Sequence, residues 1–290
     1  MTASSTPRSV LVTGASTGIG RAATLALLAE GFRVFAGIRG QAAADRLRAD
    51  APTDHAARLE AVALDVTNPA QIRAVVTQVE AAVGDRGLWG LFNNAGISVN
   101  GPTEHLAIDG LRRQLEVNLV GQVAVTQAFI PLLRRARGRI VSTGSVAGFI
   151  ALPGLGPYAM SKHAMEGFSD SLRRELRPWG IEVSLLEPGA IATEIWRKGV
   201  DDADALEREY PPQVLEQYAP LIRALRKAAG DSARRASPPE LVARDVVHAF
   251  SAVRPRTRYL VGRDSGIQRW ISRLPDRWAD ALLSKALGLK

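Results

Sequence analysis

The sequence contains no cysteine, which excludes disulfide bonds, thiol nucleophiles and thiolate metal ligands. Long apolar runs are also lacking, since no stretch approaches the roughly 20 apolar residues of a membrane span. No signal-peptide pattern precedes the first apolar run, so we expect a soluble, cytoplasmic protein without a transmembrane segment. Histidine is scarce and scattered without ligand-like spacing, so we expect no metal site: His55, His105, His163 and His248.

Acidic residues are outnumbered, with 29 Asp and Glu against 37 Lys and Arg, for a net charge of +8. Such an excess can indicate binding to nucleic acid or to an anionic membrane. The arginines are dispersed, however, and the densest group, at 134–139, spans an expected helix end, where cations complement the helix dipole. Aromatic residues are not interleaved with basic ones as in a base-stacking platform. We therefore favour a solvated arginine-rich surface, which also suits an anionic cofactor, and expect no nucleic-acid partner.

Short β-branched segments alternate with helical patterns along most of the chain. We expect strands at 9–13, 33–37, 59–64, 88–92, 139–142, 182–186 and 258–261, and the clearest helices at 41–50, 109–135, 158–177 and 238–251. Crossovers of this length suit parallel strands. The sequence therefore predicts an α/β fold, a doubly wound Rossmann-type sheet, mostly parallel and seven-stranded, with helices on both faces. No linker or repeat divides the chain, so we expect a single domain over 1–290.

A glycine-rich turn, GASTGIG at 14–20, follows the first expected strand and opens a helix. In that context glycines permit a tight turn and close approach to a phosphate, which the helix N-terminal N–H groups face. The spacing is Gly-x-x-x-Gly-x-Gly rather than Gly-x-Gly-x-x-Gly, and a lone glycine-rich turn is often only a turn. Its place at the first strand–helix junction favours the pyrophosphate site of a dinucleotide.

Arg39 follows the second expected strand, with no acidic residue nearby. In a dinucleotide fold an acid at this place bonds the ribose 2′-OH, whereas an arginine accommodates a 2′-phosphate. NADP(H) is therefore favoured and NAD remains possible, because the alternative reading of Arg39 is an exposed loop arginine.

Tyr158 and Lys162 stand four residues apart on an expected helix, so they share one face. A nearby ammonium favours phenolate and lowers the pKa of a tyrosine from about 10, toward exchange of a proton with an alcohol or carbonyl. By itself such a pair is more often an ordinary solvated one.

Taken together, the motifs resemble those of the short-chain dehydrogenase/reductase family, in its retinol/hydroxysteroid-dehydrogenase-like branch. They occur in family order as Thr13 to Gly20, Asp65-Val66, Asn93 to Gly96, Asn118, Ser145, Tyr158-x-x-x-Lys162, and Pro188-Gly189 with Thr193. The resemblance covers about 9–193 strongly and 238–262 weakly.

The resemblance implies a catalytic set of Asn118, Ser145, Tyr158 and Lys162. Tyr158 would be the acid/base, and Lys162 would lower its pKa and bond the nicotinamide ribose. Ser145 would hydrogen-bond the substrate oxygen, and Asn118 would hold a water of a proton relay.

The resemblance also implies where the cofactor lies. Gly14, Ser16, Ile19 and Gly20, with Thr17 and Gly18 in the same turn, would hold the pyrophosphate; Asp65 and Val66 the adenine; Asn94, Ala95 and Gly96 the ribose side; and Pro188, Gly189, Ile191 and Thr193 the nicotinamide. Relatives that prefer NADP often have a basic residue where this chain has Thr17, so the preference for NADP rests on Arg39.

The implied activity is interconversion of a lipophilic alcohol and its ketone or aldehyde by hydride transfer. Residues near the expected pocket mouth are mostly apolar: Ile97, Val99, Phe149, Ile150, Leu152, Leu155, Ile191, Ile195 and Trp196. No Arg or Lys is obviously placed to hold a substrate carboxylate or phosphate, and Arg197 is the nearest candidate. A lipophilic substrate is therefore favoured over a sugar or hydroxy acid. The alternative is a dinucleotide-sensing regulator or scaffold on the same fold. Such proteins typically lose the tyrosine or the lysine, and this chain has both.

The last third of the chain has a different character. We expect 194–237 to form a helical lid or pocket wall. The tail at 263–290 combines Trp270, Trp278 and other apolar residues with Arg and Lys. It is expected to cover the enzyme's own core or pocket rather than lie on a membrane. The helices at 109–135 and 158–177 are apolar on more than one face, through Val117, Val120, Val123 and Val125 on the first and Ala159, Met160, Met165 and Phe168 on the second, which predicts a homodimer or homotetramer.

Overall fold

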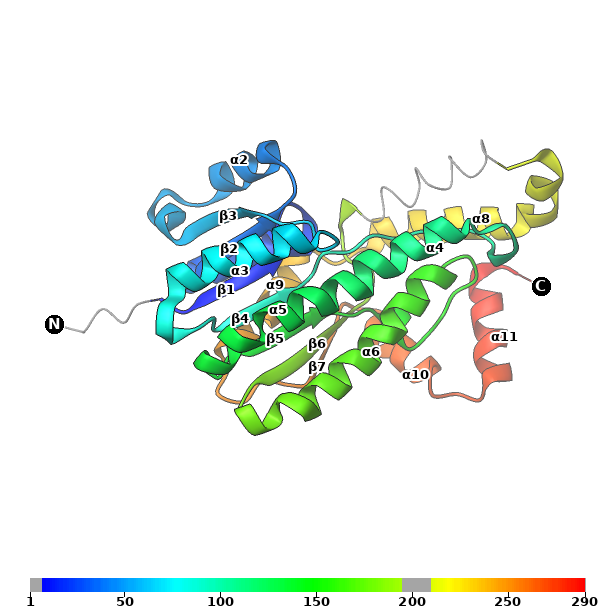
Figure 1. The fold of residues 1–290 in the computed structure, drawn as a ribbon. Coiled ribbons are helices and arrows are strands. Elements are labelled where there is room, and N and C mark those ends of the chain that lie inside the picture. The colour runs from blue at the N-terminus through cyan, green and yellow to red at the C-terminus, as the bar shows by residue number, and fades with distance from the viewer. Residues whose placement is uncertain (1–6, 195–209, 290) are drawn as a thin grey trace.

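The computed structural model describes residues 7–194 and 210–289, and its centre is one seven-stranded sheet. All neighbouring strands are parallel, in the order β3-β2-β1-β4-β5-β6-β7 (Figure 1). The strands are β1 (Ser9–Thr13), β2 (Arg33–Ile38), β3 (Leu59–Ala63), β4 (Gly90–Asn93), β5 (Arg139–Thr143), β6 (Glu182–Pro188) and β7 (Arg258–Val261). The predicted Rossmann-type fold is confirmed.

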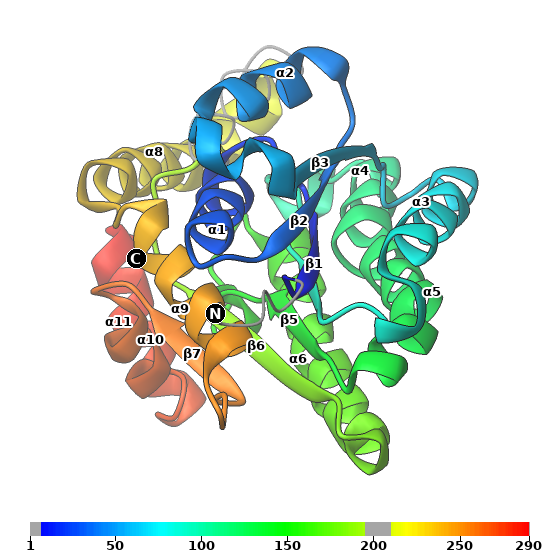
Figure 2. The ribbon, with the colours of Figure 1, turned by 90° about the vertical axis from the view of Figure 1, so that its left-hand side faces the viewer.

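Helices cover both faces of this sheet (Figure 2). One face carries α1 (Gly18–Ala29), α2 (Gln41–Asp50) and α9 (Pro239–Ser251), and the other carries α3 (Pro69–Val83), α5 (Gly121–Ala136) and α6 (Gly156–Leu176). Each face has its own apolar cluster, which is why the inner strands are apolar at nearly every position rather than at every second one. All five residues of β1 are buried.

The fourth strand begins later than predicted. Leu88 donates its N–H to the Leu132 carbonyl at the end of α5, and Trp89 donates to the Ser9 carbonyl, each over 3.0 Å. The N–H of Leu88 therefore bonds to a helix end, and β4 pairs with β1 only from Gly90 onward.

The helix expected at 109–135 is a composite. It consists of α4 (Ile108–Leu115), a π-helical turn η4 (Glu116–Val120) and α5, with Pro131 inside α5. By length and composition alone the run Ile108–Ala136 could cross a membrane. In this structure it lies along the sheet, where Val125 and Phe129 are fully buried, so its apolar character is that of a core helix.

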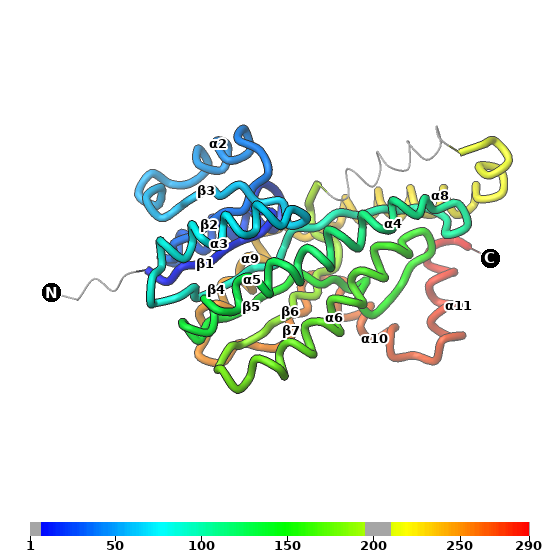
Figure 3. Tube along the Cα trace, viewed as in Figure 1, coloured from blue at the N-terminus to red at the C-terminus, as the bar shows by residue number. Residues whose placement is uncertain are grey.

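Beyond β6, the described residues form α8 (Pro212–Arg235), α9, β7, α10 (Ser265–Ile271) and α11 (Asp276–Leu287). The tail contacts α8 through α11 (Figure 3). Its two tryptophans are not buried against the rest of the protein, because Trp270 is 61% and Trp278 67% exposed. The tail nevertheless contacts β7 and the short helix η5 (Val146–Gly148) through α10, so its expected role in covering the core or pocket stays a prediction in which these two side chains take no part.

The expected association faces are also only partly free. Val125, Ala159 and Met165 belong to the protein's own core, whereas Val120 is 48% and Met160 49% exposed. Self-association through these helices stays a prediction.

A buried arginine joins the sheet to the end of α9. Arg139 is 8% exposed and donates to the carbonyls of Ala249 over 2.7 Å and Ala252 over 2.5 Å. Trp89 donates its indole N–H to the Phe250 carbonyl over 3.0 Å. These side chains satisfy carbonyls at the helix C-terminus, where a cation is favoured by the helix dipole.

We expect Arg139→Met to lower the free energy of unfolding by about 2–4 kcal/mol, because buried carbonyls lose their donors. Urea denaturation followed by circular dichroism measures the change. The exposed Arg113→Met is the matched control and should shift stability by less than about 0.5 kcal/mol. Equal effects of the two substitutions would contradict this account of Arg139.

Candidate active site

The predicted site residues gather at the carboxyl edge of the sheet. They follow β1, β2, β3, β4, β5 and β6, and the strand order reverses between β1 and β4. The connections that follow β1 and β4 run in opposite directions along the sheet. Ligands of doubly wound sheets bind at the point where this direction changes.

The glycine-rich turn has the geometry of a phosphate cradle. Gly14 and Gly18 have φ values of 64° and 52°, a region that side chains disfavour. At Gly20 a Cβ would lie 2.1 Å from the Gly14 carbonyl oxygen, so only glycine lets α1 begin this close to the turn. The N-terminal N–H groups of α1 thereby approach the turn without side chains in between. This arrangement fits the pyrophosphate of a dinucleotide.

Asn94 and Thr13 hold that turn in place. The Thr13 hydroxyl accepts the backbone N–H of Asn94 over 2.9 Å and that of Ala95 over 3.0 Å. The Asn94 amide donates to the Thr13 and Gly14 carbonyls over 3.1 and 3.2 Å. The Asn94 side chain is thus a brace between the turns after β1 and β4, and its expected ribose contact stays a prediction. Sequence reasoning quoted Thr13 only as part of the motif, although a hydroxyl at a buried strand end was a usable signal.

Arg39 and Asp65 lie on the β2–β3 side of this edge, as expected for an adenosine site. The Asp65 carboxylate accepts the Thr67 N–H over 2.9 Å and its hydroxyl over 2.7 Å. Burial raises the pKa of Asp65, but these Thr67 bonds and the Arg39 charge outweigh it, so the pKa lies below its usual value. Arg39 is exposed and therefore accessible to an anion.

Tyr158, Ser145 and Lys162 are brought together. Tyr158 lies in the first turn of α6, close enough to Ser145 for that side chain to affect its pKa, and Ser145 caps the short helix η5 (Val146–Gly148). The Lys162 ammonium lies 5.6 Å from the centre of the Tyr158 ring and donates to the Thr143 carbonyl over 2.7 Å. The expected acid/base constellation is therefore present in this structure.

The electrostatics differ from the sequence argument. Burial raises the pKa of Tyr158, and the Ser145 hydrogen bond lowers it by less. Burial lowers the pKa of Lys162 to about 8. The pKa of Tyr158 is therefore shifted in the direction opposite to the one expected from Lys162, because burial outweighs the effect of Ser145.

Asn118 lies in the π-helical turn, and its amide is fully engaged. It accepts the Ile97 N–H over 2.8 Å and donates to the Ile97 carbonyl over 3.0 Å and to the Ser161 hydroxyl over 3.2 Å. The side chain thus braces the loop after β4 against α6. The expected water relay through Asn118 stays a prediction.

Two further residues act in the same way and were missed. Gln114 is fully buried and bonds the Val99 N–H over 2.6 Å and the Ile97 carbonyl over 2.9 Å, while Gln122 donates to the Ala95 carbonyl. With Asn118 they form a polar ladder at every fourth residue, 114, 118 and 122. Polar residues at that spacing on an apolar helix face were the signal that could have revealed them.

The segment after β6 lies over the glycine-rich turn. A Cβ on Gly18 would lie 3.0 Å from the Thr193 methyl group, and one on Gly189 would lie 2.1 Å from an Asp264 carboxylate oxygen. Ile191 is buried, and Pro188 ends β6. The expected nicotinamide-side residues therefore lie beside the expected pyrophosphate residues.

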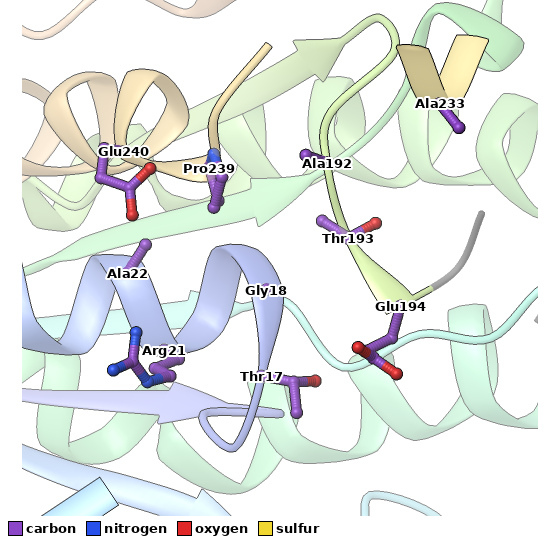
Figure 4. A pocket seen from close by; sticks show the side chains of 10 residues that line it. All are labelled: Thr17, Gly18, Arg21, Ala22, Ala192, Thr193, Glu194, Ala233, Pro239 and Glu240. Atoms are coloured by element: carbon purple, nitrogen blue, oxygen red, sulfur yellow. The ribbon is translucent and has the colours of Figure 1, made fainter. Parts of the chain in front are cut away.

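A cavity of about 680 Å³ opens beside this contact (Figure 4). Its lining comes from the start of α1, the segment after β6, the end of α8 and the start of α9: Thr17, Gly18, Arg21, Ala22, Ala192, Thr193, Glu194, Ala233, Pro239 and Glu240. It includes three of the expected cofactor residues and none of Ser145, Tyr158 and Lys162.

The expected pocket residues are placed in part. Ile150 and Ile191 are buried, and Ile97, Val99, Phe149, Leu152 and Leu155 are half-buried. Ile195, Trp196 and Arg197 lie outside the described residues. The insert contacts these loops, since Tyr218 donates to the Glu104 carboxylate over 2.5 Å and Tyr210 to the His105 carbonyl over 3.2 Å.

Comparison with known proteins places the chain in a family. The model of short chain dehydrogenases matches residues 8–204. Retinol dehydrogenase 5 of Mus musculus is 37% identical over 290 residues, covering 95% of this chain and 87% of the relative. 17-beta-hydroxysteroid dehydrogenase type 6 of Bos taurus is 37% identical over 286 residues, covering 96% and 88%. The NADPH-dependent 3-dehydrocapnine reductase of Ornithobacterium rhinotracheale is 35% identical over 286 residues, covering 97% of each.

Solved structures agree. A short-chain dehydrogenase from Streptomyces avermitilis has a TM-score of 0.76 at 27% identity, covering 99% of this chain and 98% of its own. One from Burkholderia cenocepacia in complex with NADP has a TM-score of 0.71 at 23% identity, covering 96% and 97%, and shows the fold alone. The chain therefore belongs to the short-chain dehydrogenase/reductase family, in the branch of the retinol and hydroxysteroid dehydrogenases.

Proposed function

We propose that this protein is an NADP-dependent oxidoreductase that interconverts a lipophilic alcohol and its ketone or aldehyde. The observation that carries the proposal is the convergence of Tyr158, Ser145 and Lys162, with Ser145 close enough to lower the pKa of Tyr158 and the Lys162 ammonium 5.6 Å from the tyrosine ring. A donor, a second hydroxyl and a cation converge there beside the glycine-rich turn. A regulator that only senses a dinucleotide does not need a proton donor, a second hydroxyl and a cation at one place.

In reduction, the Tyr158 hydroxyl donates its proton to the substrate carbonyl oxygen, and Ser145 hydrogen-bonds the same oxygen. In oxidation, the Tyr158 oxygen must first be deprotonated and then accepts the alcohol proton, while Ser145 keeps its hydrogen bond to the substrate oxygen. A raised pKa keeps Tyr158 protonated at neutral pH, which suits donation to a carbonyl. The nicotinamide, when bound, supplies or accepts the hydride.

Lys162 adds a charge that varies near neutral pH. Because its pKa is lowered to about 8, the ammonium predominates below that pH and the neutral amine above it. Its bond to the Thr143 carbonyl fixes the group at the end of β5, on the side of Tyr158.

The NADP preference is supported by the exposed guanidinium of Arg39, which lies where a dinucleotide fold places the adenosine ribose. The name of one relative, NADPH-dependent 3-dehydrocapnine reductase, also supports it. The lipophilic substrate is supported by the apolar side chains around the site and by relatives named for retinol and for a hydroxysteroid.

Tyr158→Phe is expected to lower kcat by about 10²–10⁴-fold, because the substrate oxygen loses its proton donor. NADPH affinity, followed by fluorescence titration, should stay within about twofold, since the hydroxyl is no part of the phosphate cradle. Tyr259→Phe, which removes a hydroxyl bound to the Arg256 N–H over 3.0 Å, is the control and should keep its turnover. A Tyr158→Phe enzyme with wild-type kcat would show that the proton donor lies elsewhere.

Arg39→Ala is expected to weaken NADPH binding by about 10- to 150-fold, the worth of a charge-assisted contact to a phosphate. NADH affinity should hardly change, because NADH has no 2′-phosphate. Arg48→Ala, an exposed arginine on α2, controls for the general loss of positive charge. Equal weakening of both cofactors by Arg39→Ala, or equal wild-type affinities for them, is the outcome that refutes this role.

A series of ketones of increasing chain length should show rising kcat/KM until the pocket is full. Each buried CH₂ adds about 0.8 kcal/mol at most, or near fourfold. Steady-state rates of NADPH oxidation measure the series. A flat series, or a preference for short polar or anionic substrates, would contradict the lipophilic pocket.

A further inference from the structure

Two glutamates form a buried pair that the proposed chemistry does not use. Glu187 is 1% exposed and is the next-to-last residue of β6. Glu166 lies on α6, and its side chain is 17% exposed. Their carboxyls approach the same guanidinium, since Arg258 lies 2.9 Å from Glu166 Oε2 and 3.1 Å from Glu187 Oε1, and they are close enough to affect each other's pKa. Among the described residues, the buried Oε1 atoms of both glutamates lack a hydrogen bond of good geometry, although Arg258 Nε forms an ion pair with Glu187 Oε1.

Two ionised carboxylates have only acceptors and repel each other at this distance. A single proton between them satisfies the pair, because one carboxyl then donates to the other. Aspartic-protease dyads share a proton for the same reason.

Cations around the pair do not remove the need for that proton. Arg258 on β7 lies 2.9 Å from Glu166 and 3.1 Å from Glu187, but both of its donated bonds to the pair go to Glu166 Oε2. It is also shared with Asp170, 3.0 Å away on α6, which in turn pairs with Arg173 and Arg174.

Arg269 on α10 completes the set of charges that face Glu187. The pKa of Glu187 is raised to about 7, first by burial and then by the neighbouring Glu166, while Arg269 and Arg258 oppose the rise. The raised pKa agrees with a proton bound by the pair at neutral pH.

The pair joins two segments that carry expected site residues, α6 and the end of β6. Glu166 follows Lys162 by one turn of α6, and Glu187 directly precedes Pro188 and Gly189. At Gly148, the last residue of the helix turn η5 that Ser145 caps, a Cβ would lie 3.1 Å from Glu166 Oε1 and 3.0 Å from the Lys162 carbonyl oxygen. A shift of either carboxyl would therefore disturb these segments together.

We propose that Glu166 and Glu187 share one proton and are positioning residues that hold the Pro188–Gly189 turn against the helix of Tyr158 and Lys162. When the proton leaves in mildly alkaline solution, the two negative charges separate and the turn beside the expected nicotinamide site loosens. The link to cofactor binding rests on the proposed function, whereas the shared proton does not.

The sign of the effect on stability follows from the raised pKa. A carboxyl that holds its proton more tightly in the folded state contributes stability in acid, below its unfolded pKa of about 4.5. This contribution is lost as the pH rises through the folded value of about 7.

Infrared spectroscopy tests the proton directly. At about pH 6 exposed carboxyls are ionised, so the wild type should retain the C=O band of a protonated carboxylic acid. Asp245, whose pKa burial also raises, adds a background that the comparison of variants subtracts. The band of the pair should disappear in Glu187→Gln and persist in Glu175→Gln, an exposed residue of the same helix. A spectrum in which Glu187→Gln removes no band would overturn the shared proton, whether or not the enzyme is active.

The second readout is the pH dependence of Tm and of KM for NADPH. From about pH 6 to about pH 8, Tm of the wild type should fall and its KM should rise several-fold, and Glu175→Gln should behave in the same way. Glu187→Gln should lose the fall in Tm, since its amide donates to Glu166 at every pH, and should keep only the part of the KM change that the titration of Lys162 causes. Its KM should also lie below that of Glu187→Ala throughout. If Glu187→Gln does not fold, Glu166→Gln serves in its place, with its amide donating to Glu187.

Unchanged wild-type trends in the glutamine variant would contradict the positioning role. Should the protein prove to have no NADPH-dependent activity, the infrared band and the Tm trend still decide the shared proton. Failure of the proposed function and failure of this inference are therefore distinguishable.

Discussion

The hydroxyl of Thr13 joins the two halves of the sheet at the point where the strand order reverses. It accepts the N–H groups of Asn94 and Ala95, and the Asn94 amide returns to the carbonyls of Thr13 and Gly14. The phosphate-cradle turn after β1 and the loop after β4 are therefore one hydrogen-bonded unit. These bonds position both the turn that precedes α1 and the loop that leads toward Asn118.

The polar ladder of α4, η4 and α5 connects this hydrogen-bonded unit to α6, the helix of Tyr158 and Lys162. Gln122, Asn118 and Gln114 bind the backbone of Ala95, Ile97 and Val99 in turn, and Asn118 also reaches Ser161 of α6. Buried polar groups of this kind are costly unless every one has a partner, so the ladder specifies a single arrangement of loop and helix. Because Ser161 lies between Tyr158 and Lys162 on α6, its bond to Asn118 helps to position both side chains.

The sequence was sufficient for the architecture. Strands buried on both faces are mostly apolar runs, so β1 and β7 have the predicted bounds and the other strands differ only at their ends. Family motifs also located the residues of the site. They did not reveal the atoms that each side chain binds, and Asn94 and Asn118 therefore proved to be engaged with backbone groups.

What the sequence could not supply depends on burial and on distant partners. The pKa of Tyr158 is raised, not lowered, because the residue is buried. The four-residue spacing of Tyr158 and Lys162 does not indicate how deeply they are buried. The exposure of Trp270 and Trp278 depends on how the tail folds back. Glu166 and Glu187 come from a helix and a strand that meet only in the folded chain, and neither belongs to a catalytic motif.

The central claim is that Tyr158, Ser145 and Lys162 form an acid/base centre beside a dinucleotide site, acting on a lipophilic carbonyl compound. The most direct measurement supplies NADPH carrying deuterium at C4, in the position that is transferred, together with a long-chain ketone. Mass spectrometry then locates the label in the product. The account predicts an alcohol with deuterium on its carbinol carbon. Formation of no alcohol from any lipophilic ketone, or of alcohol without the label, would contradict it.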